Sequence, residues 1–346
     1  MASEIEFLPL GAIIKTFKVD GTNIVQGFPT QDLYVSHNEP FFGETIGRVA
    51  NRVSGAKLNS LNGGKSYPLK ANDAPNSLHG GDQGWGKRVW EGPTPVGLRE
   101  IPGVQLDDGG ESVQFKLRSE DGDMGYPGEV LATITYTTGV QKVAGGKSAT
   151  VLGMEYEAEL VGGAEETAIN MTNHSCVHRI HMAIYFNLSG DPKIDNTEVQ
   201  LCTGSYLPVD DGGIPTGGPT TFPKVKTDSK FVLGVTDPDI DDCFVVDPSA
   251  SPELRPDRHA LISARHTGSK INLEVLSTEP AFQFYTGKYI NVPEVAGVPA
   301  RTARSAFCVE PSRYVNAVNV EEWKNQQLLK KGEKYGCRIV YRAWRE

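Results

Sequence analysis

The chain has 346 residues, which is enough to bury a large core and allows one large domain as well as two. A hydrophobic fraction of 38% with 22% charged residues is ordinary for a soluble globular protein and excludes a disordered chain. The formal net charge of −9, with no cluster of Lys and Arg, argues against nucleic acid as a partner.

The N-terminal residues predict neither export nor membrane insertion. They contain no basic segment ahead of a continuous apolar core, and no run of 18 apolar residues occurs anywhere in the sequence. The five cysteines are widely spread without a C-x-x-C pair, so we interpret them as reduced thiols rather than zinc ligands or disulfides. The sequence therefore predicts a cytoplasmic protein with no membrane partner.

Short segments of alternating apolar and polar residues recur along the chain between Gly, Pro, Asn and Asp. This alternation is typical of antiparallel strands with one face on a core and one in water. It is clearest at residues 113–118 and 152–160, and we expect further strands at 130–138, 270–276 and 337–344.

Helix signals are few, and the best of them covers residues 320–331. That segment has two glutamates early, two lysines late and Gly332 after its end. Residues 210–219, DDGGIPTGGP, are predicted to form a turn-rich connection. Without alternating helices and strands, the fold class is all-β: a large single-domain β-sandwich over residues 1–346 with few short helices.

Polar residues with catalytic chemistry lie in several apolar or Gly-rich segments. In the segment GRVANR, Arg48 and Arg52 flank Asn51 and form either a surface pair or a clamp for hydroxyl oxygens. His79 is followed by two glycines that permit close approach to its imidazole, which suits acid–base work or a structural hydrogen bond.

His174, His178 and His181 have the spacing that would line one face of a helix with metal ligands. The β-branched residues among them and the turn-forming residues before them argue against that helix. The motif H-E-x-x-H is also absent. We therefore expect no metal site.

Glu310 lies between Phe307, Val309 and a proline, in a segment suited to the end of a buried strand. A carboxylate in apolar surroundings has a raised pKa, which suits a general base near neutral pH. The alternative is a structural carboxylate in a salt bridge with Arg301, Arg304 or Arg313.

Taken together and in order, these segments make the chain resemble the galactose mutarotase (aldose 1-epimerase) family along nearly its whole length. The blocks that carry the resemblance are FFGETIGRVANRV, NSLHGG, DGDMGYPGEV, TNHS, YFNLSGDP, YLPVDDGGIPTG, FQFYTG and VEPSRYVNAVN. The resemblance implies a galactose mutarotase-like supersandwich, in which an open groove across one sheet binds a free aldohexose, galactose or glucose, without a cofactor.

The resemblance also implies a role for each matched residue. Glu310 would be the base that takes the proton of the anomeric hydroxyl, and His174 the acid that protonates the ring oxygen. The matched substrate-binding residues are Asn51, Arg52, His79, Asp241 and Gln283. Such a set of hydrogen-bonding side chains suits a neutral polyhydroxylated ligand.

The chain departs from the family pattern at residues 176–184, CVHRIHMAI, which separate the NHS triplet from YFNL. An odd insertion in a strand reverses the facing of later side chains unless it loops out. The insertion is either tolerated, an error of the gene sequence or its splicing, or inactivating; His178 or His181 could also replace His174 as the acid.

Three other functions remain open at this stage. The chain could be a sugar-binding or regulatory protein that lost turnover through the insertion, or a hexose-phosphate mutarotase, which needs a basic cluster. A glycosidase with Asp241 and Glu310 as its two carboxylates is less favoured, because the family pattern pairs Glu310 with a histidine. The sequence leaves a monomer or a homodimer open.

Overall fold

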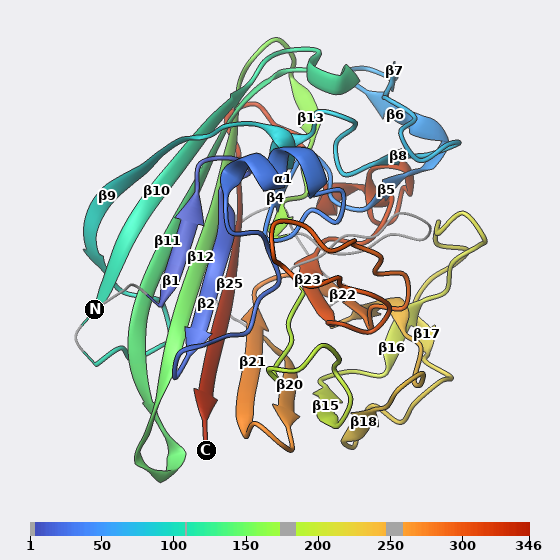
Figure 1. The fold of residues 1–346 in the computed structure, drawn as a ribbon. Coiled ribbons are helices and arrows are strands. Elements are labelled where there is room, and N and C mark those ends of the chain that lie inside the picture. The colour runs from blue at the N-terminus through green and yellow to red at the C-terminus, as the bar shows by residue number, and fades with distance from the viewer. Residues whose placement is uncertain (1–3, 108, 174–184, 247–258) are drawn as a thin grey trace.

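The computed structural model describes residues 4–107, 109–173, 185–246 and 259–346. Its largest element is a nine-stranded antiparallel sheet that forms a long curved wall (Figure 1). In spatial order its strands are β18 (Phe231–Leu233), β15 (Thr197–Leu201), β20 (His259–His266), β21 (Ile271–Ser277), β25 (Lys334–Arg345), β12 (Lys147–Gly162), β11 (Glu129–Val143), β10 (Gly110–Ser119) and β9 (Glu91–Arg99).

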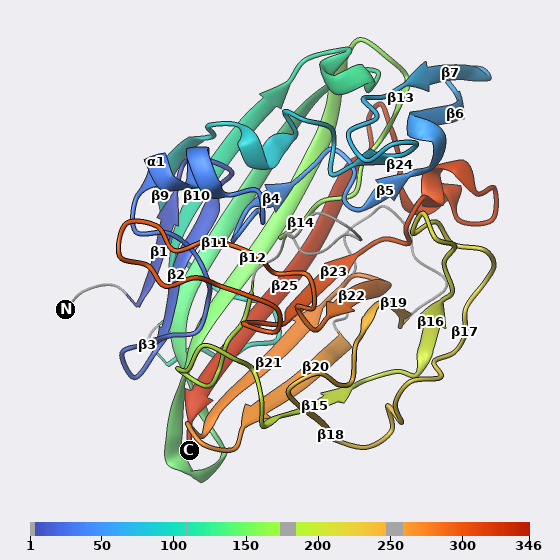
Figure 2. The same ribbon diagram turned by 45° about the vertical axis from the view of Figure 1, so that its right-hand side comes forward.

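A second, five-stranded antiparallel sheet lies to one side of this wall, where Figure 2 shows β22 and β23 most clearly. Its strands, in spatial order, are β17 (Thr220–Thr221), β16 (Ser205–Leu207), β19 (Asp241–Val245), β22 (Ala281–Tyr285) and β23 (Cys308–Ser312).

The two sheets share one hydrophobic core. Phe244, Phe284 and Val309 from the small sheet belong to the same buried cluster as Tyr156 and Tyr341 of the large sheet. Because side chains alternate across a strand, the residues between these core positions face the other side of the small sheet. The structure is therefore the expected all-β sandwich, and one face of its smaller sheet is turned away from the shared core.

The other regular elements of the described residues are a small three-stranded sheet, short strand pairs and short helices. The three-stranded sheet contains β1 (Ile5–Leu8), β2 (Ile13–Val19) and β3 (Thr22–Asn23). The pairs are β4 (Thr45–Ile46) with β14 (Thr172–Asn173), β5 (Arg52–Val53) with β8 (Ser77–Leu78), β6 (Lys57–Leu61) with β7 (Lys65–Pro68), and β13 (Glu166–Ala168) with β24 (Leu328–Lys330). The helices are α1 (Gln31–His37) and the 3-10 turns η1 (Ser54–Ala56), η2 (Trp85–Lys87), η3 (Asp123–Gly125), η4 (Ala144–Gly146), η5 (Ala317–Asn319) and η6 (Lys324–Gln326).

The alternating segments form strands as predicted. In β12 the apolar residues from Leu152 to Leu160 are buried, while Glu155, Glu157 and Glu159 between them remain accessible to solvent. The other four predicted segments coincide with most of β10, β11, β21 and β25, and the bounds of each strand differ from the prediction by one to five residues. No helix among the described residues is both long and apolar enough to cross a lipid bilayer.

The helix predicted at residues 320–331 is wrong. Only η6 is helical there, and β24 pairs with β13 through Leu328 and Leu329. The buried amides of Gln326 and Gln327 explain the difference, since they bond the backbone of Tyr314 and Val318. Tertiary hydrogen bonds thus override the charge pattern of an amphipathic helix.

Candidate active site

Three adjacent strands of the small sheet bring Asp241, Gln283 and Glu310 to the face turned away from the core. Gln283 on β22 lies opposite Glu310 on β23. On its other side Gln283 lies opposite Cys243, two residues beyond Asp241 on β19. The Gln283 Nε2 donates a hydrogen bond of 2.8 Å to Asp241 Oδ1. The three predicted residues therefore form one continuous polar row.

Glu310 is 2% exposed and belongs to a fully buried strand. Its negative charge acts on two neighbouring thiols. Burial raises the pKa of Cys243 to about 12 and raises that of Cys308 well above its ordinary value, and the charge of Glu310 acts in the same direction on both. The carboxylate thus lies in a low-dielectric setting, where a charge has strong effects on groups around it.

The arginines considered as salt-bridge partners for Glu310 have other partners. Arg313 pairs with Glu279 at 2.8 Å, and both side chains are almost fully buried. Arg304 donates to the backbone oxygens of Gly234 and Pro238. Arg301 stacks on aromatic rings and donates to the oxygen of Gly27.

Arg52 is the first residue of β5, and Asn51 directly precedes that strand. Pairing of β5 with β8 places Arg52 opposite Leu78, and so brings Asn51 beside His79. The Arg52 Nε donates to Asp73 Oδ2 at 2.8 Å, which fixes the guanidinium. The backbone N–H of Arg52 donates to Asn51 Oδ1.

His79 is fully buried, and its Nδ1 accepts a 3.2 Å hydrogen bond from the backbone N–H of Asn51. Burial, together with the positive charges of Arg52 and Lys87, holds the pKa of His79 well below its ordinary value. The imidazole is therefore neutral at physiological pH. Because Nδ1 accepts a hydrogen bond, its single proton lies on Nε2, which acts as a donor.

One cavity gathers four of the predicted binding residues. It is lined by Asn51, Arg52, Val209, Gly213, Asp241, Cys243, Gln283 and Val315. His79 adjoins this cavity through its bond to Asn51, and Glu310 through its pairing with Gln283.

The connection at residues 210–219 forms part of this cavity, which sequence reasoning missed. Gly213 lies so close to Arg52 that an added Cβ would be 2.8 Å from its Nη1. The Asn76 Nδ2 donates to the oxygen of Gly212 and holds the loop there. The loop is the predicted turn-rich connection, and its glycines were the one available signal of close approach.

Arg48 does not belong to the site, so both interpretations of an Arg48–Arg52 pair are wrong for it. Its guanidinium is 2% exposed and donates to Ser119 Oγ and to the oxygens of Ser119, Glu120 and Pro127. Arg48 therefore ties the chain before β5 to the end of β10.

The predicted acid, His174, lies outside the described residues, as do His178, His181 and the segment 176–184. Residues 172 and 173, directly before His174, belong to the described part of the chain. In β14, Thr172 Oγ1 donates to the oxygen of Pro311 on β23, and Asn173 Nδ2 donates to the oxygen of Gly43. The residue before His174 is thus anchored beside the strand that carries Glu310.

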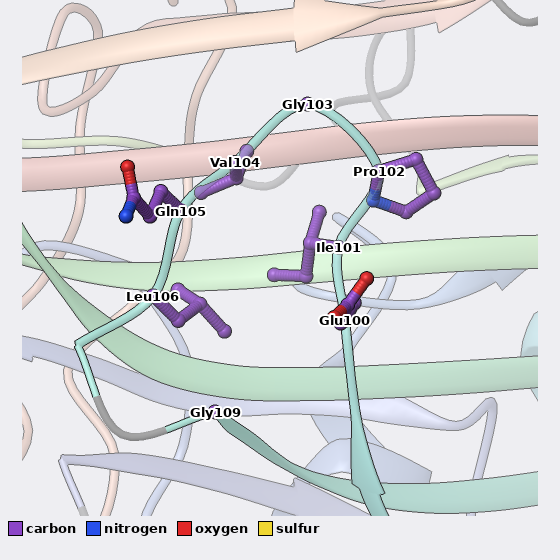
Figure 3. A pocket seen from close by; sticks show the side chains of 8 residues that line it. All are labelled: Glu100, Ile101, Pro102, Gly103, Val104, Gln105, Leu106 and Gly109. Atoms are coloured by element: carbon purple, nitrogen blue, oxygen red, sulfur yellow. The ribbon is translucent and has the colours of Figure 1, made fainter.

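No group of three or more potential metal-binding His, Cys, Asp or Glu side chains occurs within the described ranges. Another cavity, shown in Figure 3, is lined by residues 100–106 and Gly109 and shares no residue with the polar row. Its side chains are mostly aliphatic. The cavity at Asp241 is instead lined by the hydrogen-bonding side chains of Asn51, Arg52, Asp241 and Gln283, a set that suits a hydroxyl-rich ligand.

The site is thus a row of hydrogen-bonding side chains on one face of the smaller sheet of an all-β sandwich. The chain matches the family model for aldose 1-epimerase over residues 2–342. The chain belongs to the aldose 1-epimerase family.

Relatives agree with this assignment. The chain is 36% identical to the bifunctional protein GAL10 of Pachysolen tannophilus, over 96% of this chain and 44% of that protein. It is 34% identical to human galactose mutarotase, over 91% of this chain and 82% of that protein. It spans less than half the length of the bifunctional relatives it matches.

Among solved structures, a GalM/aldose epimerase homologue from C. elegans aligns with a TM-score of 0.77 at 25% identity. The alignment covers 99% of this chain and 95% of that one. The fold predicted from the sequence, a galactose mutarotase-like β-sandwich, is therefore confirmed.

Proposed function

We propose that this protein is an aldose 1-epimerase that interconverts the α and β anomers of a free aldohexose, galactose or glucose. The observation that carries the proposal is the polar row Asp241–Gln283–Glu310, which adjoins a cavity lined by Asn51 and Arg52. Membership of the aldose 1-epimerase family supports the same activity.

In the proposed reaction the Glu310 carboxylate takes the proton of the anomeric hydroxyl. The C1–O1 bond becomes a carbonyl, the bond from C1 to the ring oxygen breaks, and the ring oxygen receives a proton from His174. The open aldehyde rotates about the C1–C2 bond, and the ring recloses on either face with the proton transfers reversed. All atoms balance without an external reductant or oxidant.

The remaining residues bind and orient the sugar in this proposal. His79 donates its Nε2 proton toward the ring oxygen, since the imidazole is neutral with Nδ1 occupied by Asn51. Asp241 accepts from sugar hydroxyls, and Arg52 donates to them.

The charges around the cavity favour a free sugar over a hexose phosphate. Among the described residues, the charged side chains that line it are Arg52, already paired with Asp73, and the carboxylate of Asp241. A phosphate group needs several unopposed cations. Polarimetry separates the two substrates: the change of optical rotation is measured with galactose and, in parallel, with a hexose 6-phosphate.

Polarimetry on freshly dissolved α-galactose tests the proposed activity. We expect the full chain to accelerate the approach to equilibrium rotation. A parallel variant lacking residues 176–184 shows whether the insertion matters. Galactose binding without acceleration by the full chain would establish the sugar-binding alternative instead.

A further inference from the structure

The loop that joins α1 to β4, residues 38–44, is folded by its own side chains. The Asn38 Oδ1 accepts a 2.8 Å bond from the backbone N–H of Phe42, and its Nδ2 donates at 2.7 Å to Glu44 Oε1. Asn38 is 2% exposed and Glu44 1% exposed. The loop is therefore a compact buried turn.

Lys87, at the end of η2, is the charged residue that closes this turn from outside. Its ammonium donates to the backbone oxygen of Asn38 at 2.6 Å and to Glu44 Oε1 at 2.8 Å. It also lies 3.6 Å from the centroid of the Phe41 ring, over the face of that ring. Lys87 thus contacts the beginning, middle and end of the loop at once.

Phe41 carries this contact to the site. Its ring lies against the imidazole of His79, with 5.7 Å between centroids and 48° between planes. The backbone of Phe41 has a φ of 53°, a left-handed conformation that a bulky residue adopts only when its surroundings impose it. The contacts of Lys87 and the hydrogen bonds of Asn38 supply those surroundings.

We propose that Lys87 is a positioning residue, which holds Phe41 against His79 and so fixes the orientation of that imidazole in the sugar site. The proposal rests on the proposed function, and it adds residues that do not themselves line the cavity. The same loop accepts a hydrogen bond from Asn173 through the oxygen of Gly43, so it also touches the chain just before His174.

The orientation of His79 matters because its proton has to stay on Nε2. A ring that turns away from the backbone N–H of Asn51 loses the bond that fixes this tautomer. Arg52 and Lys87, both positive, are charged side chains of the described residues that act on His79, and Glu44 faces Lys87 from the loop. Removing Lys87 therefore loosens the ring and removes one of the charges that keep it neutral.

The test compares Lys87→Met with wild type by polarimetry and by NMR of the histidine ring nitrogens. We expect kcat to fall about 10-fold while KM changes less than about 3-fold, as for other outer positioning residues. We also expect the His79 signals, identified with a His79→Gln variant, to show mixed tautomers or protonation at higher pH. Lys87→Arg, which keeps the charge and the ring contact, should restore most of the activity.

Lys70→Met is the matched control, because Lys70 forms an exposed ion pair with Asp82 and should change nothing. Phe41→Leu provides a second route if Lys87→Met fails to fold, and should reproduce the loss in kcat and the change at His79. The effects of Lys87→Met and Phe41→Leu should be non-additive in the double variant.

The proposal is overturned if folded Lys87→Met or Phe41→Leu protein keeps the wild-type kcat and His79 spectrum, or if the two losses add. A wild-type chain that does not accelerate mutarotation would instead overturn the proposed function. The His79 spectrum does not depend on turnover, so it still decides the positioning role in that case.

Discussion

At the scale of single residues, the contact between Gly213 and Arg52 gives a test of the cavity wall. Gly213 has a φ of 74°, and a methyl group there would lie 2.8 Å from Arg52 Nη1. We expect Gly213→Ala to displace the guanidinium and raise KM for galactose about 10-fold, with a smaller effect on kcat. Steady-state polarimetry at several sugar concentrations measures both constants.

Gly217→Ala is the control for this change, because Gly217 lies in the same loop with no atom within 4 Å of an added Cβ. Equal KM values for Gly213→Ala and wild type would mean that Arg52 does not set the affinity for sugar.

Ionisation of Glu44 makes the stability of the fold depend on pH. Burial raises its pKa from 4.5 to about 7, against the lowering effects of Lys87 and Asn38. A raised folded pKa means that the native state binds more protons than the unfolded state, so this group's contribution declines as pH rises from about 4.5 through 7. The shift corresponds to roughly 3 kcal/mol.

The variant Glu44→Gln keeps the shape of the side chain but cannot ionise. We therefore expect its free energy of unfolding, measured in urea, to increase relative to that of wild type by roughly 3 kcal/mol between pH 4.5 and pH 8. A difference between the two proteins that stays constant over this range would contradict the ionisation of Glu44.

At the scale of elements, we expect the loss of buried Arg48 to reduce the free energy of unfolding more than the loss of an accessible arginine. Its guanidinium forms buried hydrogen bonds with Ser119 Oγ and with the backbone oxygens of Ser119 and Pro127, and Arg48→Met would remove all three. We expect a loss of about 3 kcal/mol in the free energy of unfolding, with KM unchanged. Arg265→Met, which removes an accessible ion pair with Glu346, should cost less than about 1 kcal/mol. Urea unfolding of both variants tests the contrast, and similar losses would contradict it.

The strands could be predicted from sequence because half-buried strands carry an alternating pattern. In β12 the buried Leu152 and Leu160 flank accessible glutamates, so the pattern and the structure coincide. The segment 320–331 carries the charge pattern of a helix, but buried Gln326 and Gln327 bond the backbone of Tyr314 and Val318, 9 to 13 residues earlier, instead. Such side-chain hydrogen bonds leave no periodic pattern in the segment itself.

At the scale of the whole molecule, the site could be predicted from the resemblance to a family but not from local sequence patterns. Asp241, Gln283 and Glu310 are far apart in sequence, and only the register of β19, β22 and β23 brings them together. The apolar residues around Glu310 indicate a buried carboxylate, but they do not indicate which side chains lie beside it. It also assigned residues 210–219 to plain connection, although Gly213 lines the cavity.

Several expectations concern the molecule as a whole and stay predictions. They are the single domain over residues 1–346, the cytoplasmic location, and the monomer or homodimer. The roles of Glu310 and His174 are also predictions, and they carry the proposed chemistry.

The most direct test of those roles is polarimetry of fresh α-galactose with wild type and with Glu310→Gln. The amide keeps the size of the carboxylate but cannot take the anomeric proton. We predict that wild type accelerates mutarotation and that Glu310→Gln, folded and still able to bind galactose, falls to the spontaneous rate. A variant that retains a rate close to that of wild type would contradict the account.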